Sequence, residues 1–179
     1  MRIIAGRWRG RPLAAPPGAA TRPTSDRARE GLFSMLQSRL GGFEELAVLD
    51  LFAGTGALGL EALSRGAASC TFIEQDRAAI DALRRNVASL GAEAQAEIRP
   101  QDATALAGGR YDLVFLDPPY GSGLGRKALE RLVASGALAP GALVSVESAA
   151  DAEVALPGLD ALAGRRYGKA KITLLRNPA

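Results

Sequence analysis

Between residues 46 and 147, short apolar runs alternate with stretches that have the periodicity of amphipathic helices. Apolar runs of this length are typical of strands that are buried on both faces of a sheet. Strands that alternate with helices form a parallel sheet with helices on both faces. The sequence therefore predicts an α/β fold with a doubly wound, mostly parallel sheet. We expect strands at 46–51, 70–74, 94–99, 112–117 and 142–147, helices at 57–65, 77–90 and 125–135, and a short helical turn at 104–107.

The C-terminal region predicts a hairpin rather than another helix. Residues 161–167 and 169–175 have the pattern of two strands, with Gly168 near the turn between them. Two strands joined by so short a connection pair in antiparallel fashion. The hairpin would add an antiparallel edge and bring the sheet to seven strands.

The N-terminal region carries most of the positive charge. Residues 1–40 contain eight arginines against Asp26 and Glu30, a net charge of +6, whereas the rest of the chain has a net charge of −3. We expect an arm or short hairpin at 1–20, followed by a helix that Thr24 or Ser25 caps and that runs to Leu40. The sequence thus predicts a basic N-terminal extension at 1–42 and a larger domain at 43–179.

Such a concentration of positive charge is typical of a surface that contacts nucleic-acid phosphates, although a solvated surface without a ligand is the alternative. Trp8 lies among these arginines, where it would contact a base or plug the core. The predicted RNA-binding residues are Arg7, Trp8, Arg9, Arg11, Arg22, Arg27 and Arg29.

The chain contains no histidine and a single cysteine, Cys70. This excludes Ser-His-Asp hydrolysis, Cys-His chemistry, a histidine general base, internal disulfides and cysteine-rich metal sites. We therefore expect no metal, and we expect Cys70 to be a core residue rather than a nucleophile. No apolar run is long enough to span a bilayer, and the first residues lack the apolar core of a signal peptide. We expect a soluble, cytoplasmic protein that does not contact membranes.

A glycine-rich loop joins the first expected strand to the next helix. It contains Gly54-x-Gly56-x-x-Gly59, in which glycines let the backbone turn tightly and approach a ligand. Glu74 follows Gly54 by 20 residues and ends the second expected strand, where a carboxylate can accept both hydroxyls of an adenosine ribose. A tight turn that merely needs glycine is the alternative, but the loop and Glu74 together indicate an adenosine-containing cofactor.

S-adenosylmethionine explains the surrounding residues better than other nucleotides. The sequence offers no hydride-transfer site for NAD, and no Gly-Lys-Ser/Thr follows as a P-loop requires. Asp50 is placed to meet the cationic methionine amine or its bound water, and Asp102 could accept the adenine amino group beside the Ala103 amide. Each acid alone is more often a helix cap or a solvated side chain. The predicted cofactor-binding residues are Asp50, Phe52, Ala53, Gly54, Gly56, Glu74, Gln75, Asp102 and Ala103.

Asp117-Pro118-Pro119-Tyr120 closes the apolar run 113–116 of the fourth expected strand. Two prolines cannot continue a sheet, so the strand ends there, at the edge where doubly wound folds bind ligands. A carboxylate, backbone carbonyls and an aromatic ring suit the binding of a planar group with an amino substituent. Proline that only ends the strand is the alternative. We predict that Asp117, Pro118, Pro119 and Tyr120 are the catalytic residues.

With these motifs, the chain resembles a class I S-adenosylmethionine-dependent methyltransferase with a Rossmann-like fold. The Asp117–Tyr120 block is similar to that of methyltransferases that modify amino groups. The blocks at 2–11, 22–30 and 58–67 resemble those of the bacterial 16S rRNA guanine-N2 methyltransferases, and the similarity runs nearly end to end. The segment 148–159 departs from this pattern because it is shorter and rich in Ala and Pro, which puts substrate contacts from it in doubt.

The resemblance implies methyl transfer to the exocyclic N2 of a guanine in 16S rRNA, on the small ribosomal subunit or an assembly intermediate. Asp117 and the Pro118 carbonyl would accept the two amino hydrogens, and Tyr120 would stack on the flipped base. We expect a monomer. DNA adenine-N6 and protein glutamine methyltransferases are alternatives, although they usually carry Asn at the place of Asp117. A non-catalytic assembly protein that holds RNA and the cofactor is a further alternative.

Overall fold

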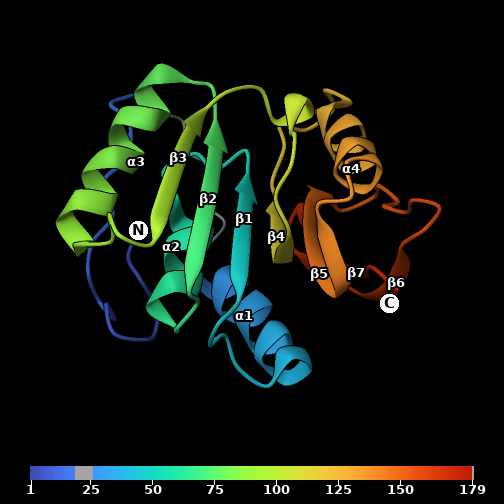
Figure 1. Cartoon of the computed structure of the whole chain (residues 1–179), viewed down its shortest axis with the longest axis horizontal. Helices are drawn as coiled ribbons and strands as arrows, with labels where there is room; N and C mark the ends of the chain where they lie inside the picture. The colour runs from blue at the N-terminus through green and yellow to red at the C-terminus, as the bar shows by residue number, and fades with distance from the viewer. Residues whose placement is uncertain (19–25, 179) are drawn as a thin grey trace.

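The computed structural model describes residues 1–18 and 26–178, which include one seven-stranded sheet of order β3-β2-β1-β4-β5-β7-β6. Figure 1 shows this sheet with its helices. The strands are β1 (Ala47–Leu51), β2 (Ser69–Glu74), β3 (Ala96–Pro100), β4 (Tyr111–Leu116), β5 (Leu138–Ala149), β6 (Asp160–Tyr167) and β7 (Ala170–Arg176). The helices are α1 (Asp26–Leu40), α2 (Ala57–Ser64), α3 (Arg77–Leu90), the short η1 (Ala103–Ala105) and α4 (Leu124–Ala134).

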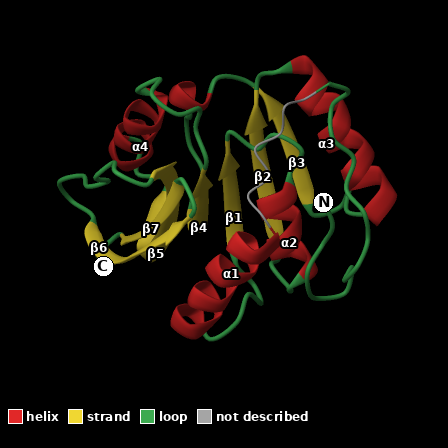
Figure 2. Cartoon of the chain, turned by 180° about the vertical axis from the view of Figure 1, so that it is seen from behind, coloured by secondary structure: helices red, strands yellow, loops and turns green. Residues whose placement is uncertain are grey.

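Helices cover both faces of the sheet, as predicted. Two apolar clusters form, one on each face, because successive residues of a strand point to opposite sides. Val48 of β1 joins the cluster that includes side chains of α1, α2 and α3. Leu49 joins the other cluster, with side chains of α4 and η1. Figure 2 shows α1 and α2 in front of the strands. The predicted α/β fold is confirmed.

The strand directions place the carboxyl ends of β1, β2, β3, β4 and β5 at one edge of the sheet. These five strands pair in parallel, and β7 pairs antiparallel with both β5 and β6, as the predicted hairpin requires. The sheet order turns back between β1 and β4, which is the place where ligands bind in open sheets of this kind.

β5 begins four residues earlier than the sequence predicts, at Leu138. The register of β4 against β5 shifts between Tyr111 and Leu113, and the extra residues of β5 include exposed Pro140 and Gly141. Proline and glycine usually interrupt a strand, but here the pairing continues past them through this irregularity.

The N-terminal arm packs onto α2 and shares the core of the larger domain. The backbone amides of Ile4 and Ala5 donate to the two carboxylate oxygens of Glu61, at 2.8 and 3.0 Å. Ile3 and Leu13 are buried in the same cluster as the side chains of α1 and α2. The predicted cap of the first helix, Thr24 or Ser25, lies outside the described residues. Within the described part of the chain, no helix is long and apolar enough to cross a membrane.

Candidate active site

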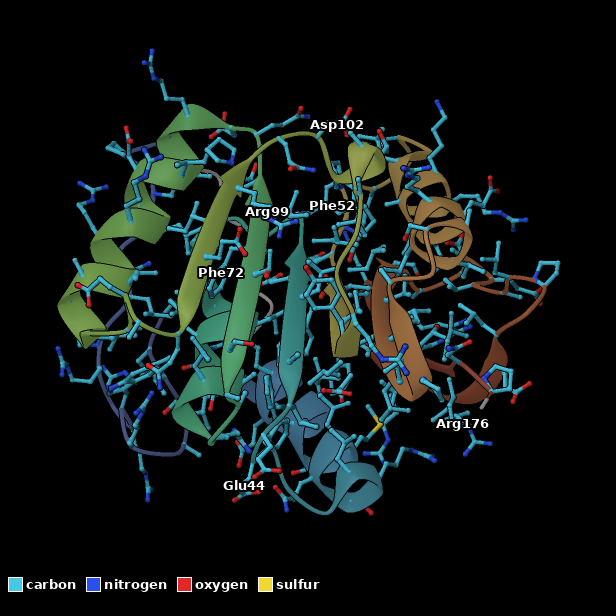
Figure 3. All side chains as sticks on the ribbon, in the orientation of Figure 1. Glu44, Phe52, Phe72, Arg99, Asp102 and Arg176 are labelled. Atoms are coloured by element: carbon cyan, nitrogen blue, oxygen red, sulfur yellow. The ribbon has the colours of Figure 1, made fainter. Side chains whose placement is uncertain are left out.

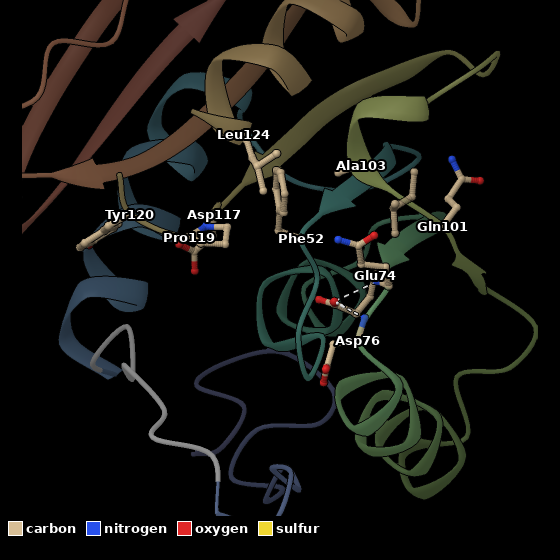
Figure 4. Close-up of a pocket in the computed structure, with 11 residues that line it drawn as sticks. Phe52, Glu74, Asp76, Gln101, Ala103, Asp117, Pro119, Tyr120 and Leu124 are labelled. Carbon is tan, nitrogen blue, oxygen red and sulfur yellow. Dashed lines mark hydrogen bonds between the residues drawn. The ribbon is translucent and has the colours of Figure 1, made fainter. Parts of the chain in front are cut away.

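A cavity of about 450 Å³ lies at the carboxyl edge of the sheet, where β1, β2, β3 and β4 end. Figure 4 shows Asp117, Pro119 and Tyr120 on one side of Phe52, and Glu74 and Asp76 on the other. Segments that are far apart in the sequence therefore face one space. The residues that line it are Phe52, Ile73, Glu74, Gln75, Asp76, Gln101, Ala103, Asp117, Pro119, Tyr120 and Leu124.

The three glycines of the loop after β1 and the start of α2 serve two purposes. Gly54 and Gly56 have φ angles of 58° and 87°, a left-handed conformation that glycine adopts at little cost. Gly59 has no such angle, but a Cβ there would overlap with Phe72 and lie 2.6 Å from Sγ of Cys70. The first two glycines shape the loop, and the third lets α2 pack closely on β2.

Phe52 precedes these glycines and also has a positive φ, 58°. A bulky residue in this conformation costs on the order of 1–3 kcal/mol and is found most often at functional sites. Its ring lines the cavity, in the middle of the residues that Figure 4 draws. The sheet and loop thus hold an apolar ring where the predicted cofactor would lie.

Glu74 is held by three backbone amides. Oε1 accepts a hydrogen bond from Gly54 (2.7 Å), and Oε2 accepts from Gln75 and Asp76 (2.9 Å each). A carboxylate offers about four acceptor positions, so Glu74 retains capacity for a hydroxyl group. These contacts join the glycine loop to the end of β2 and fix the carboxylate in the cavity wall.

Asp50 lies beneath the loop and does not line the cavity. Its side chain is 1% exposed, and Oδ2 accepts a hydrogen bond of 2.9 Å from the amide of Gly59. Burial raises the pKa of Asp50 to about 8; the Gly59 hydrogen bond opposes this rise and the charge of Glu74 adds to it. The observed contact supports the start of α2, and a contact with the methionine amine stays a prediction.

Asp102 is exposed and caps η1. Its Oδ1 accepts hydrogen bonds from the amide and hydroxyl of Thr104, at 2.8 and 2.9 Å, and these bonds lower the pKa of Asp102. The cavity is lined instead by its neighbours, Gln101 and Ala103. The adenine contact of Asp102 therefore remains a prediction, and Gln101 is a lining residue that sequence reasoning missed.

The loop after β4 separates two cavities. Pro118 is buried and lines a second cavity of about 320 Å³, which shares Pro119 and Tyr120 with the first. The hydroxyl of Ser122 donates to the carbonyl of Pro119 at 2.8 Å, which stabilises the loop. Tyr120 is 38% exposed and lines both cavities. A cavity on each side of this loop suits a reaction between two molecules.

Residues 146–149 at the end of β5 and residues 152–155 after it form the far wall of the second cavity. Leu116 pairs with Val146, so Asp117, directly after β4, and Glu147, within β5, lie side by side. Sequence reasoning missed Glu147, although it follows a buried apolar run just as Asp117 does. The short 148–159 segment thus borders a cavity despite its length.

The predicted RNA-binding arginines of the arm lie away from the cavities. Arg7, Arg9 and Arg11 are exposed. The amide of Arg7 donates to the Ser64 carbonyl, and the Arg11 side chain donates to the Ser89 carbonyl (2.7 Å). Both carbonyls belong to the last turns of helices that begin at the carboxyl edge. These arginines therefore lie toward the opposite edge of the sheet from Asp117.

Two of the side chains that were predicted to contact RNA, Arg29 and Trp8, are buried in this structure. Arg29 is fully buried; its guanidinium contacts Asp26 at 2.6 Å and Glu61 at 3.6 Å and donates to the Arg2 carbonyl. Trp8 is 9% exposed and packs in the core, with the Arg7 guanidinium 4.2 Å from its ring centroid. Both side chains attach the arm and α1 to the domain. Arg27 is exposed, and Arg22 lies outside the described residues.

Comparisons with known proteins agree with this fold. Residues 1–176 match the family described as conserved hypothetical protein 95. The chain is 44% identical over 163 residues to the ribosomal RNA small subunit methyltransferase D of Escherichia coli (strain K12), a match that covers 90% of this chain and 80% of that protein. The protein of the same name from Haemophilus influenzae is 39% identical over 168 residues, which cover 88% of this chain and 83% of that protein.

Solved structures extend the similarity over the whole chain. The putative methyltransferase yhhF from Escherichia coli is 40% identical, with a TM-score of 0.89 and coverage of 100% of this chain and 98% of that one. A putative methylase from Haemophilus influenzae is 33% identical, with a TM-score of 0.84 and coverage of 100% and 99%. The predicted resemblance to S-adenosylmethionine-dependent rRNA methyltransferases is confirmed. The chain belongs to the conserved hypothetical protein 95 family and has the Rossmann-like fold of methyltransferases.

Proposed function

We propose that this protein transfers a methyl group from S-adenosylmethionine to the exocyclic N2 of a guanine in 16S rRNA. One observation carries the proposal: Asp117, Pro119 and Tyr120 line the same cavity as Glu74 and Gln75. An amino-group acceptor and an adenosine cofactor would therefore meet in one space. Relatives named ribosomal RNA small subunit methyltransferase support rRNA as the substrate. Such a substrate would place the reaction in the cytoplasm.

The residues of the cavity suit S-adenosylmethionine. Glu74 retains acceptor capacity for a ribose hydroxyl, and Phe52 and Ile73 offer apolar contacts for an adenine ring. When bound, the cofactor supplies an electrophilic methyl group on a sulfonium. Phe52 and Leu124 lie between the Glu74 side and the Asp117 side of the cavity (Figure 4), so a cofactor held at Glu74 would share the cavity with the loop after β4.

The loop after β4 would orient the guanine. The Asp117 carboxylate and the Pro118 carbonyl accept the two hydrogens of the amino group, which directs the nitrogen lone pair at the methyl carbon. The same two oxygens stabilise the positive charge that develops on that nitrogen. The ring of Tyr120 stacks on the flipped base, a contact of about 1–3 kcal/mol. The methylated nitrogen is acidic and releases its proton to solvent, so no strong base is required.

Methyl transfer from labelled S-adenosylmethionine tests the proposal. The acceptors are small ribosomal subunits that lack the modification, free 16S rRNA, tRNA and DNA, each digested afterwards to nucleosides for mass analysis. We expect N2-methylguanosine from the 16S rRNA substrates alone. Methyladenine in DNA would favour an adenine-N6 methyltransferase, and no transfer to any acceptor would favour a non-catalytic assembly protein.

A further inference from the structure

The C-terminal hairpin is a second basic region of the chain. Residues 160–176 contain five basic residues against one acid, Asp160. Three of the basic residues, Arg165, Arg166 and Lys169, are exposed and lie at or beside the turn between β6 and β7. The net charge of the chain does not reveal this cluster, because acidic residues between 40 and 160 offset its positive charge.

The turn of the hairpin lies at the carboxyl edge of the sheet. Ala149, at the end of β5, pairs with Ala170, at the start of antiparallel β7. The amide of Ala150 donates to the Lys169 carbonyl, and Nζ of Lys171 donates to the Ala152 carbonyl, both at 2.9 Å. Ala149 and Ala152 also line the second cavity. The basic turn is therefore attached to the wall of the cavity beside Tyr120.

The hairpin is anchored, and its charges face solvent. Tyr167 packs against α1, since a Cβ on Gly31 would overlap with its hydroxyl. The nearest acid in sequence, Asp160, lies at the other end of β6, where Arg176 contacts it at 4.0 Å. Asp151 and Glu153, in the segment that follows β5, are exposed. Within residues 1–18 and 26–178, no ion pair joins either acid to Arg165, Arg166 or Lys169. The three cations thus hold positive charge beside the cavity.

We propose that Arg165, Arg166 and Lys169 bind the RNA phosphates on either side of the target nucleotide. A flipped base that reaches Tyr120 brings its own phosphates close to this edge, because adjacent phosphates are only a few ångströms from the base. Arginine and lysine at such a place neutralise phosphates and position the strand. The arm arginines Arg7 and Arg11 contact the last turns of α2 and α3, toward the opposite edge of the sheet, so they would meet other nucleotides. The inference rests on the proposed function.

The test compares two triple variants of equal charge. In the hairpin variant, Arg165, Arg166 and Lys169 are each changed to Gln. In the control, Arg39, Arg110 and Arg176 are changed to Gln; all three are exposed and lie toward the amino edge, at the end of α1, before β4 and at the end of β7. Figure 3 shows Arg176 at the opposite edge from Phe52 and Asp102.

Binding to unmodified 16S rRNA is measured between about 50 and 200 mM salt, where each lost phosphate contact lowers the salt slope by about 0.7–0.9. We expect the hairpin variant to lose about 2–3 units of slope and to raise KM for RNA at least 10-fold. Its thermal unfolding and its affinity for S-adenosylmethionine should match those of the wild type. The control should keep the wild-type slope and KM.

Equal slopes for the hairpin variant and the control would overturn the inference. So would a hairpin variant that loses binding to anionic phospholipid vesicles and keeps its binding to RNA. The proposed function fails separately: a wild-type protein that binds RNA through the hairpin but forms no N2-methylguanosine contradicts the reaction alone. If the hairpin variant methylates RNA with an unchanged KM for RNA, the phosphate contacts of the hairpin are contradicted and the proposed reaction is not.

Discussion

Nδ2 of Asn86, on α3, donates a hydrogen bond of 2.9 Å to the backbone carbonyl of Thr55 in the glycine loop. The same side chain donates to the carbonyl of Ala14 (3.1 Å) and accepts from its amide (2.7 Å). Asn86 is 2% exposed. One buried amide therefore joins the N-terminal arm to the loop that shapes the candidate cofactor site.

Replacement of Asn86 with Leu should destabilise the contacts of both the N-terminal arm and the glycine loop with α3. The change leaves the polar groups of Ala14 and Thr55 without their partner, and each unsatisfied buried group costs about 1–3 kcal/mol. We expect a lower free energy of unfolding in urea and weaker binding of S-adenosylmethionine by calorimetry. Arg85→Ala, exposed on the same helix, is the control. If Asn86→Leu keeps both stability and cofactor affinity, the amide does not couple the arm to the loop.

Gly59 and Gly54 should respond differently to alanine. At Gly59 the new Cβ would overlap with Phe72 and approach Cys70, so Gly59→Ala should cost about 1–3 kcal/mol of stability from overpacking. At Gly54 nothing lies within 4 Å, and only the left-handed backbone is disfavoured, by about 1–2 kcal/mol. We expect Gly59→Ala to show the lower melting temperature, and Gly54→Ala to lose cofactor affinity at a smaller cost in stability. The reverse order of melting temperatures would contradict this division of roles.

The buried carboxyl of Asp50 should make stability depend on pH. Its pKa rises from the ordinary 3.8 to about 8 on folding, mainly because burial disfavours the charge. Between these values the unfolded chain is ionised whereas the folded protein keeps the proton, so the contribution of Asp50 to stability falls as pH rises through this window. Below the window it is constant.

Asp50→Asn removes this titration. We expect the wild type to lose up to about 1.4 kcal/mol per pH unit relative to Asp50→Asn between about pH 5 and pH 8. Urea unfolding at several pH values measures the difference, and Asp81→Asn, exposed on α3, is the control. Parallel stability curves for wild type and Asp50→Asn would show that the carboxyl is ionised in the folded protein.

Arg29 should matter for folding rather than for RNA. Its replacement with Met leaves the fully buried Glu61 with less compensation for its charge, and a broken buried ion pair typically costs about 3–5 kcal/mol. We expect a large drop in melting temperature, with an unchanged salt slope of RNA binding for the folded fraction. Arg27→Gln, exposed on the same helix, should leave the melting temperature unchanged. A stable Arg29→Met variant with a reduced salt slope would restore the predicted RNA contact.

The sequence predicted the strand ends well because chain direction alone brings the carboxyl ends of parallel strands together. Glu74, Asp117 and Tyr120 line one cavity for that reason. The arginines were harder to interpret, because an Arg-rich segment looks the same whether a side chain meets solvent or a buried acid. Arg29 pairs with Glu61, a partner more than 30 residues away that no local pattern reveals. The basic hairpin was missed because its place beside the cavity depends on the antiparallel pairing of β7 with β5.

Asp117 should be needed for turnover and not for the cofactor. Asp117→Ala removes an acceptor for the guanine amino group, and loss of one such hydrogen bond in a transition state typically lowers kcat about 100- to 1000-fold. The ribose contact at Glu74 is separate, so the affinity for S-adenosylmethionine should stay within about twofold, a change of only about 0.4 kcal/mol in binding free energy. Single-turnover methylation of unmodified small subunits measures the rate, and calorimetry measures cofactor binding. Asp160→Ala, an exposed acid in β6, is the control, and melting curves verify that both variants fold. Wild-type turnover by Asp117→Ala would contradict the assignment of the acceptor to the loop after β4.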